Sequence, residues 1–145
     1  MTSDAEDTPS LEKVPHEECM QLVASLTVGR VAVAAPGEAP LVVPISYVVD
    51  GQTVVFRTGA ETELARLQAN PVSFQVDFVD AHHRSGWSVL IQGTAVEVTD
   101  AEKEALSVQP WVGGDRSHWI RIVPANVSGR RIRLPEIVWD SRGYL

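Results

Sequence analysis

The chain has 145 residues, of which 44% are hydrophobic, and a formal net charge of −7 at pH 7. This length predicts one domain with its own core, and no apolar run reaches the roughly 20 residues that a membrane helix requires. The first residues do not form a signal-peptide pattern, and the single cysteine, Cys19, excludes an intrachain disulfide. We therefore expect a cytoplasmic protein that does not bind membranes.

The negative charge belongs mainly to the start of the chain. Residues 1–18 contain six acidic residues and one basic residue, and residues 1–13 show no apolar periodicity. We expect residues 1–13 to be a disordered acidic tail. From Arg116 onward, six arginines outnumber two acidic residues, Glu136 and Asp140. This basic excess suits a phosphorylated ligand, but it is too small for a nucleic-acid-binding surface.

A helix and then a strand are predicted after this tail. Pro15 suits a first helical turn, and apolar residues at positions 20, 22, 23 and 26 give the helix a stripe that can be buried. Gly29 ends the helix, and residues 30–34 form the first strand. Cys19 falls within this helix, where no histidine is placed to activate it as a nucleophile.

A β-hairpin follows. Residues 42–49 and 53–58 are rich in β-branched residues, and Asp50-Gly51 lies between them. This dipeptide is favoured by two-residue turns, whose central residues need positive φ. Residues 72–79 alternate as a further strand. No glycine-rich dinucleotide fingerprint follows any strand, so a Rossmann fold is excluded.

The junction between the hairpin and a short helix is the candidate binding site. Arg57 and Thr58 end a strand, Thr62 is the predicted N-cap, and Asn70-Pro71 closes the helix. Backbone N–H groups, a hydroxyl and a guanidinium at one place suit an anion such as a phosphate. The alternative is that Thr62 only caps the helix while Arg57 is a solvated charge.

Residues 80–86 form a polar connection that contains His82 and His83. Nearby aspartates raise the hypothesis of a metal site. Adjacent histidines rarely converge on one ion, however, and no third ligand occurs at a familiar zinc spacing. We therefore predict an exposed connection without a metal.

The rest of the chain predicts more strands and a rim helix. Gly93, in the longest strand, marks a bulge or a close backbone approach. The expected elements are a strand over 87–98, a helix over 101–106 capped by Thr99 or Asp100, a hairpin-like pair over 119–123 and 127–132 interrupted at Pro124, and an apolar tail over 135–145. In this pair Arg131 and Arg133 share one face. About six strands with short connections and three short helices predict a mainly β (α+β) fold, a small antiparallel barrel.

Several short motifs occur in an informative order. They are Pro44-Ile45-Ser46-Tyr47, Asp50-Gly51, Phe56-Arg57-Thr58-Gly59, Leu64 to Asn70-Pro71, Phe74-Gln75-Val76-Asp77, Gly86-Trp87-Ser88-Val89 with Gly93, and Trp119-Ile120-Arg121-Ile122-Val123-Pro124 followed by Ser128-Gly129-Arg130-Arg131. Together they resemble the pyridoxamine 5'-phosphate oxidase-like family of flavin-binding split barrels. The resemblance covers roughly residues 15–133. It implies a six-stranded antiparallel split β-barrel with short peripheral helices, over residues 14–134. The tail over 135–145 is too apolar for a free linker, so we expect it to dock on a partner subunit.

The resemblance also implies a homodimer that binds FMN in a groove between two subunits. The flavin carries the redox chemistry in such proteins, so no general acid or base is nominated. Each tryptophan has core or interface packing as its alternative role. The implied cofactor residues are Arg57, Thr58, Thr62 and Glu63 near the phosphate, Pro44, Ile45 and Gln75 along the ring, Trp87 as an aromatic candidate, and Trp119 and Arg121 from the other chain.

Glu63 stands where relatives usually have a lysine that holds the cofactor phosphate. A carboxylate there repels a phosphate by about 4 kcal/mol per charge pair at close range. Three hypotheses follow. The first is a flavin-dependent oxidoreductase that acts on an unknown small molecule, and the second is an F420-binding reductase of the same fold. The third is a dimeric binding protein that has lost its flavin; pyridoxamine phosphate oxidase activity itself is the least favoured.

Overall fold

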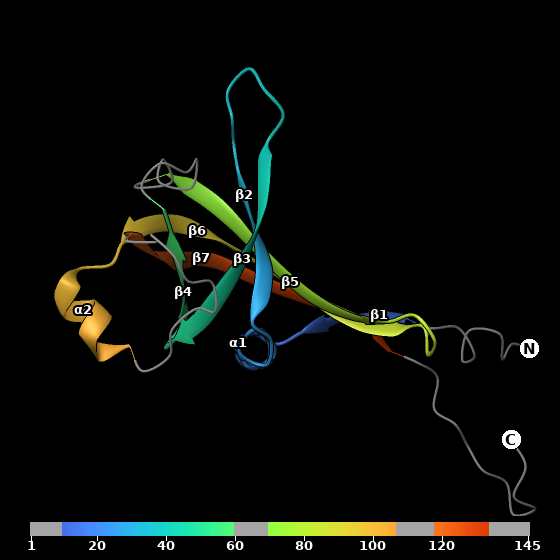
Figure 1. The fold of residues 1–145 in the computed structure, drawn as a ribbon. Coiled ribbons are helices and arrows are strands. Elements are labelled where there is room, and N and C mark those ends of the chain that lie inside the picture. Colours follow the sequence, from blue (N-terminus) through green and yellow to red (C-terminus); the bar gives the residue numbers. More distant parts are fainter. Residues whose placement is uncertain (1–9, 60–69, 107–117, 134–145) are drawn as a thin grey trace, which may run out of the picture.

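The computed structural model describes residues 10–59, 70–106 and 118–133. Seven strands form one antiparallel sheet, in the order β1-β7-β4-β3-β2-β5-β6, with a further pairing between β7 and β6 (Figure 1). The elements are β1 (Ser10–Val14), α1 (His16–Ala24), β2 (Val28–Val33), β3 (Leu41–Asp50), β4 (Thr53–Thr58), β5 (Pro71–Asp80), β6 (Ser85–Glu97), α2 (Asp100–Ala105) and β7 (His118–Arg133).

The sheet closes into a barrel because β7 pairs with both β4 and β6. Six strands form the barrel, and β1 lies outside it, paired with the second half of β7. The predicted six-stranded antiparallel barrel is confirmed. The helix predicted between Thr62 and Asn70 lies outside the described residues. No helix in the described ranges is long and apolar enough to cross a membrane.

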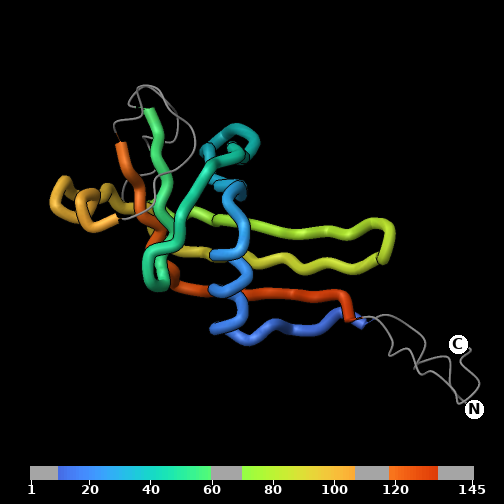
Figure 2. Tube along the Cα trace, turned by 60° about the horizontal axis from the view of Figure 1, so that its bottom comes forward, coloured from blue at the N-terminus to red at the C-terminus, as the bar shows by residue number. Residues whose placement is uncertain are grey.

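Beyond the barrel, four strands continue as an arm. The ends of β5 and β6, the second half of β7, and β1 run side by side away from the barrel (Figure 2). The arm gives the long strands two environments, one in the barrel wall and one on an open sheet. It also extends the outer surface of the barrel well past the closed part.

The strand β1 corrects the predicted boundary of the acidic tail. Ser10–Val14 pair with Gly129–Arg133 of β7, so residues 10–13 belong to the sheet. Glu12 accepts a hydrogen bond from Arg133 at 3.0 Å, which supports the backbone pairing with opposite charges. The polar composition of this segment concealed a strand because an edge strand needs backbone pairing more than it needs apolar side chains.

The strand β7 corrects the predicted hairpin-like pair. It runs without a break through Pro124, which would interrupt an ordinary central strand. The register against β6 shifts here, since Gln92 pairs with Asn126 and Gly93 with Pro124. The bulge accommodates the proline, and a Cβ on Gly93 would lie 2.0 Å from the Val123 carbonyl oxygen. The predicted bulge or close approach at Gly93 is therefore confirmed as both.

The turn between β3 and β4 is also shifted from its prediction by one residue. Asp50 pairs with Thr53, so Gly51 and Gln52 are the two turn residues. Gly51 has φ 59°, and no non-glycine residue of this turn has positive φ. A glycine at the first turn position fits a type II′ hairpin, which requires positive φ only there.

The barrel interior and helix α1 form one core. Cys19, Met20 and Val23 of α1 are buried against it, and Pro15 is the N-cap rather than a first-turn residue. The Tyr47 hydroxyl donates a hydrogen bond to the Val23 carbonyl at 2.5 Å and thereby ties α1 to β3. Burial raises the pKa of Tyr47, so this hydroxyl stays protonated. The fully buried aromatic side chains are Tyr47, Phe56 and Phe74.

Candidate functional site

The outer surface of the barrel carries a straight row of four residues. Arg30 on β2 pairs with Pro44 on β3 and with Gln75 on β5, and Gln75 pairs with Leu90 on β6. The residues flanking Arg30 in sequence, Gly29 and Val31, are buried. Because successive side chains of a strand point to opposite faces, the row points away from the core. Pro44, Arg30, Gln75 and Leu90 are hereafter the outer row.

A hydrogen-bonded network lies on this row. One Arg30 Nη atom is 3.4 Å from an Asp77 carboxylate oxygen, and the Gln75 amide nitrogen donates to the other Asp77 oxygen at 3.0 Å. Asp77 therefore links β2 and β5 through their side chains. The Arg30 side chain nevertheless remains 49% exposed, so its guanidinium keeps donors that face solvent.

At the end of β4, Arg57 and Thr58 point to opposite sides of the strand. Thr58 is completely buried, whereas Arg57 lies over the ring of Trp119, with 5.4 Å between its Cζ atom and the ring centroid. This cation–π contact holds the guanidinium on the outer face. The structure thus places Arg57 at the surface, as an anion site requires, but not the Thr58 side chain. Thr62 and Glu63 lie outside the described residues.

The other predicted contacts from β7 are engaged within their own chain. Trp119 is 8% exposed and packs with Val55 and Val98 in a small cluster outside the barrel. Arg121 is 14% exposed on its side chain and contacts Asp50 at 2.8 Å and Glu102 at 3.4 Å. The Arg121 guanidinium also donates to Thr53 Oγ1. These contacts pin helix α2 and the β3–β4 turn to β7.

Two further predicted side chains point away from the outer row. Ile45 is buried in the core between Pro44 and Ser46, so only its backbone is available to a ligand on the outer face. Trp87 packs against the core. It pairs with Arg131, whose guanidinium bonds Glu18 of α1, and this places Trp87 on the α1 side of the sheet. Of the predicted ring contacts, the outer row brings together the side chains of Pro44 and Gln75.

The sequence did not single out Arg30 or its contact with Asp77. Arg30 occupies a strand between buried Gly29 and Val31, which marks it as outward-facing once the strand is recognised. Its partner Asp77 is separated from it by 47 residues. Only the β2–β5 register, which joins strands that are not neighbours in sequence, brings the two together.

The outer face of these strands is mainly basic. From β3 across β2, β5, β6 and β7 to β1, the register places Arg30, Arg130 and Lys13 on it, with Arg57 at the end of neighbouring β4. Among the described strand residues two acidic side chains share this face, and Glu102 of α2 reaches it through its contact with Arg121. The two on strands are Asp77, which bonds Gln75 and Arg30, and Asp50, which is paired with Arg121. The field therefore favours an anionic ligand.

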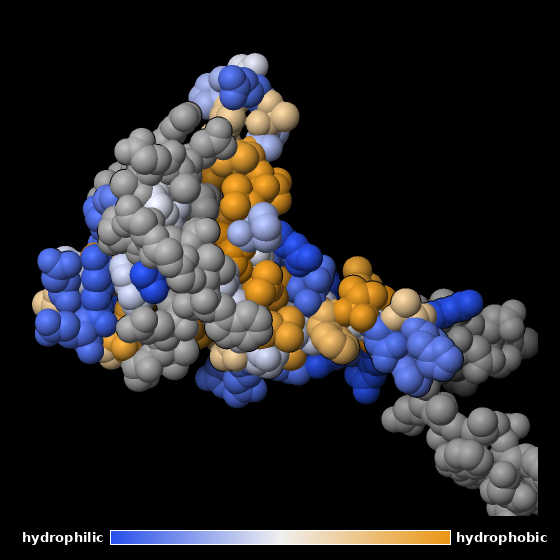
Figure 3. Space-filling view, viewed as in Figure 1, coloured by the Kyte–Doolittle hydropathy of each residue, from blue (hydrophilic) through white to orange (hydrophobic). Residues whose placement is uncertain are grey.

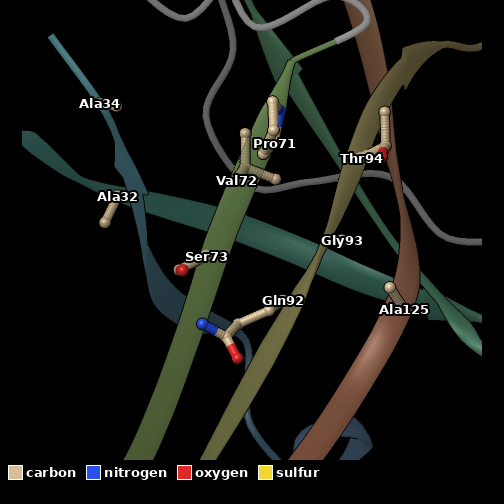
Figure 4. A pocket seen from close by; sticks show the side chains of 9 residues that line it. All are labelled: Ala32, Ala34, Pro71, Val72, Ser73, Gln92, Gly93, Thr94 and Ala125. Carbon is tan, nitrogen blue, oxygen red and sulfur yellow. The ribbon is translucent and has the colours of Figure 1, made fainter. Parts of the chain in front are cut away.

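Beside the outer row lies an open hollow with a volume of about 430 Å³ (Figure 4). The next row along the same strands, Ala32, Ser73 and Gln92, forms part of its floor. Small side chains on adjacent strands leave the space, and the β7 bulge at Ala125 borders it. No group of three potential metal ligands occurs among the residues that the structure describes.

Comparison with protein families assigns residues 15–131 to pyridoxamine 5'-phosphate oxidase. The chain belongs to this family. An uncharacterized protein of Mycobacterium tuberculosis is 32% identical over 139 residues, which cover 90% of this chain and 88% of the relative. The similarity therefore extends over almost the whole length of both proteins.

Solved structures show the same fold. An FAD-binding protein from Mycobacterium smegmatis is 30% identical, with a TM-score of 0.69 over 86% of this chain and 100% of that chain. An FAD-binding protein from Mesorhizobium loti is 23% identical, with a TM-score of 0.70 over 87% of this chain and 99% of that chain. Most of this chain therefore has the same split-barrel architecture as these two proteins.

Proposed function

We propose that this protein is a homodimeric flavin-binding oxidoreductase that acts on a small molecule. The observation that supports the proposal is the outer row beside Arg57, a mainly basic surface that includes Pro44 and Gln75, two of the residues that the family resemblance implies for the ring. Pro44 and Leu90 offer apolar side chains at the two ends of the row for a ring to pack on, and Gln75 offers a polar contact between them. The similar mycobacterial structure is that of an FAD-binding protein.

Arg57 is the proposed phosphate contact. Its guanidinium can bond a phosphate in two places at once, and the Trp119 ring restricts the guanidinium to the outer face. Thr62 and Glu63 follow in sequence and remain part of the proposed site. The isoalloxazine and the phosphate nearest to it are common to FMN and FAD, so the same site suits either cofactor. The bound flavin supplies the redox chemistry, and the protein positions it.

We infer a homodimer from apolar side chains that flank the outer row. Val42 is 60% exposed and Val28 is 46% exposed, and both lie on the outer face next to Pro44 and Arg30. Figure 3 shows apolar surface below the tip of the β2–β3 hairpin and again toward the arm. A symmetric partner would cover these residues and enclose the ring. Sedimentation at low micromolar concentration tests the dimer, and a monomer there contradicts the shared groove.

Trp119 and Arg121 are left out of the partner's contribution. Both side chains are already satisfied within one chain, and releasing Arg121 would leave Asp50 and Glu102 without their cation. The F420-binding reductase and the dimer that has lost its flavin remain the alternative outcomes, because Glu63 replaces the usual lysine. The lone Cys19, buried in α1, is consistent with the proposed cytoplasmic location.

The visible spectrum of protein purified from a host that makes FMN, FAD and F420 tests the proposal. A flavin spectrum supports it, a deazaflavin spectrum supports the F420 alternative, and no chromophore together with no binding on titration supports the cofactor-free dimer. Arg57→Ala should then weaken FMN binding more than tenfold, since a charge-assisted pair contributes about 1.5–3 kcal/mol. The matched control is Arg84→Asn, in an exposed loop, because asparagine tolerates the φ of 52° at that position.

The substitution Glu63→Lys tests the register of the site. It replaces a carboxylate that repels phosphate with the ammonium that relatives use, so FMN affinity should rise by more than tenfold, at about 1.4 kcal/mol per decade. Added salt should reduce the gain, because an exposed ion pair is screened. An unchanged affinity would mean that Glu63 does not face the phosphate, and a loss would make the glutamate itself a ligand contact.

A further inference from the structure

We propose that Arg30, Gln75 and Asp77 form a reader of the pyrimidine edge of the flavin, with Gln75 accepting a hydrogen bond from ring N3–H and Arg30 donating to an adjacent ring carbonyl. The inference rests on the proposed function and names the residues that recognise one edge of the ring. The sequence resemblance pointed to Gln75 alone, and it gave no partner for this side chain and no role for Arg30.

The orientation of the Gln75 amide is fixed by its neighbour. An ionised carboxylate can only accept hydrogen bonds, so the amide nitrogen, not the oxygen, must face Asp77, and the contact is 3.0 Å long. The amide oxygen therefore points away from Asp77 and presents acceptor lone pairs. Gln75 is only partly exposed, whereas a free glutamine on an open surface would present either group. Asp77 is thus a positioning residue for this acceptor.

The donor beside this acceptor comes from Arg30. Arg30 and Gln75 are directly paired across β2 and β5, so their side chains leave the sheet next to each other on one face. The guanidinium carries five N–H donors, and its described side-chain contact is the single one to Asp77 at 3.4 Å. Donor and acceptor therefore lie side by side between Pro44 and Leu90.

This arrangement complements one chemical pattern. The pyrimidine edge of an isoalloxazine presents a carbonyl, an N–H and a second carbonyl in sequence, which is an acceptor, a donor and an acceptor. The pair of Gln75 and Arg30 offers the matching acceptor and donor. FMN, FAD and F420 share this edge, so the inference holds whichever of them is the cofactor. Reduction places negative charge near N1 and its adjacent carbonyl, where a cation is stabilising.

A purely structural role for the ion pair is the competing explanation. Both partners are more than one-third exposed, and exposed pairs contribute about 0–1 kcal/mol to stability. A pair with so small an effect on stability does not explain why the Gln75 amide is held in one orientation. It also does not explain why Arg30 keeps N–H donors on the same face. The experiment therefore uses ligand discrimination as its readout, which a structural ion pair would not change.

The test compares the affinity of FMN with that of 3-methyl-FMN, in which a methyl group replaces the N3 proton. Wild-type protein should bind FMN about two- to twelvefold more tightly, which corresponds to the value of about 0.5–1.5 kcal/mol for one neutral hydrogen bond. In Gln75→Met, which keeps the volume but has no strong acceptor, the preference should fall to near unity. The matched control Ser73→Ala lies on the same face of β5 and should keep the preference.

The roles of the two charged residues are separated in the same assay. Asp77→Ala should reduce the preference for FMN, and Asp77→Asn, whose amide oxygen can still accept from Gln75, should restore most of it. Arg30→Met should weaken binding of dithionite-reduced FMN more than that of oxidised FMN, because the lost cation faces the edge where the reduced ring is negative. Equal weakening of both forms would overturn the role of Arg30.

The outcomes separate this inference from the function on which it rests. If wild-type protein binds none of FMN, FAD and F420, the proposed function fails. If it binds FMN and 3-methyl-FMN equally, the proposed function stands and the edge reader is wrong. A preference that persists in Gln75→Met would show steric rejection of the methyl group, which also overturns the role of the amide.

Discussion

Arg121 and Arg30 occupy two regions of the same sheet, and their environments are opposite. At the corner formed by α2, β7 and the β3–β4 turn, Arg121 has a side chain only 14% exposed and bonds three partners. On the outer row, Arg30 is 49% exposed and has one long contact with a carboxylate. A guanidinium whose donors are used within the chain holds the fold together, whereas one that keeps donors at the surface is available to a ligand. The resemblance in sequence implied Arg121 as a cofactor contact, whereas the residue that we propose on this surface is the more exposed Arg30.

Arg131 lies between these two cases and turns the comparison into a series. Its side chain is 34% exposed and bonds Glu18 with both guanidinium nitrogens, joining β7 to helix α1. If burial and saturation of donors decide which arginines are structural, the cost of removing each should fall in the order Arg121, Arg131, Arg30. Unfolding of the three alanine variants in urea tests that order.

Arg121→Ala should have the largest effect on stability. It removes charge-assisted hydrogen bonds from a largely buried side chain, together with the packing of its stem, and should lower the free energy of unfolding by about 2 kcal/mol. Urea denaturation measures the loss. Arg121→Lys keeps a charge without the planar fork and should lose less. A loss below that of Arg30→Ala would contradict the assignment of the corner as structural.

Arg131→Ala should cost less than Arg121→Ala at neutral pH, and its cost should depend on pH. The hydrogen bond from Arg131 holds the pKa of Glu18 below its ordinary value of 4.5. A carboxylate with a lowered folded pKa contributes stability above its unfolded pKa, and this contribution is lost as pH falls through the folded pKa. The difference in unfolding free energy between wild type and variant should therefore shrink below about pH 4.5.

Urea titrations at neutral pH and near pH 3 measure this difference. Glu18→Gln is the matched control, because it removes the titrating group from the same pair. The unfolding free energy of Glu18→Gln should therefore lack most of the additional decrease at acidic pH that distinguishes wild type from Arg131→Ala. A difference that stays constant through the acidic range would mean that the pair stabilises the protein through packing of the arginine stem alone.

Arg30→Ala should change stability by less than about 0.5 kcal/mol, the effect expected of an exposed pair. The same variant should bind FMN less tightly than wild type. The main loss at Arg30 is thus expected in binding, whereas the main loss at Arg121 is expected in stability. Thermal unfolding without ligand measures the first quantity, and titration with FMN the second. A destabilisation by Arg30→Ala as large as that by Arg121→Ala would remove the distinction between the two regions.

Local patterns predicted most of the strands and one helix cap. β4 has the predicted bounds, and Thr99 accepts the predicted N-cap hydrogen bond from Glu102 at 3.3 Å. These features depend on residues within one element or one turn, so a sequence window contains their causes. The order of the motifs then gave the barrel through the family resemblance.

The missed features depend on pairings between distant segments. β7 continues past Pro124 only because β6 supplies a register shift opposite it, and β1 exists only because β7 offers a free edge. The Arg30–Asp77 contact requires the β2–β5 pairing, and the capture of Arg121 by Asp50 joins residues 71 positions apart. No local pattern contains such information, so the sequence alone could not show that Ile45 and Trp87 pack in the core or that Arg121 is bonded within its own chain.

The smallest effect on stability is predicted at the tip of the β5–β6 hairpin. The ion pair there is exposed and connects two residues of the same turn. The Asp80 carboxylate accepts hydrogen bonds from the His83 ring at 2.7 Å and from the His83 backbone N–H at 3.1 Å. The side-chain bond is the main cause that lowers the pKa of Asp80 from its ordinary value of 3.8, and the backbone bond adds to it. His83→Ala should therefore raise the pKa of Asp80 toward its ordinary value, because the main hydrogen bond that lowers it is lost while the backbone bond persists. Since a lowered folded pKa stabilises only above the unfolded pKa, any contribution of Asp80 disappears as pH falls through its folded value, and neutral stability should barely change.

Carboxyl-carbon NMR titration follows the pKa of Asp80, and urea unfolding at neutral pH follows the stability. A loss of stability as large as that of Arg131→Ala would show that exposure does not rank the ion pairs of this protein.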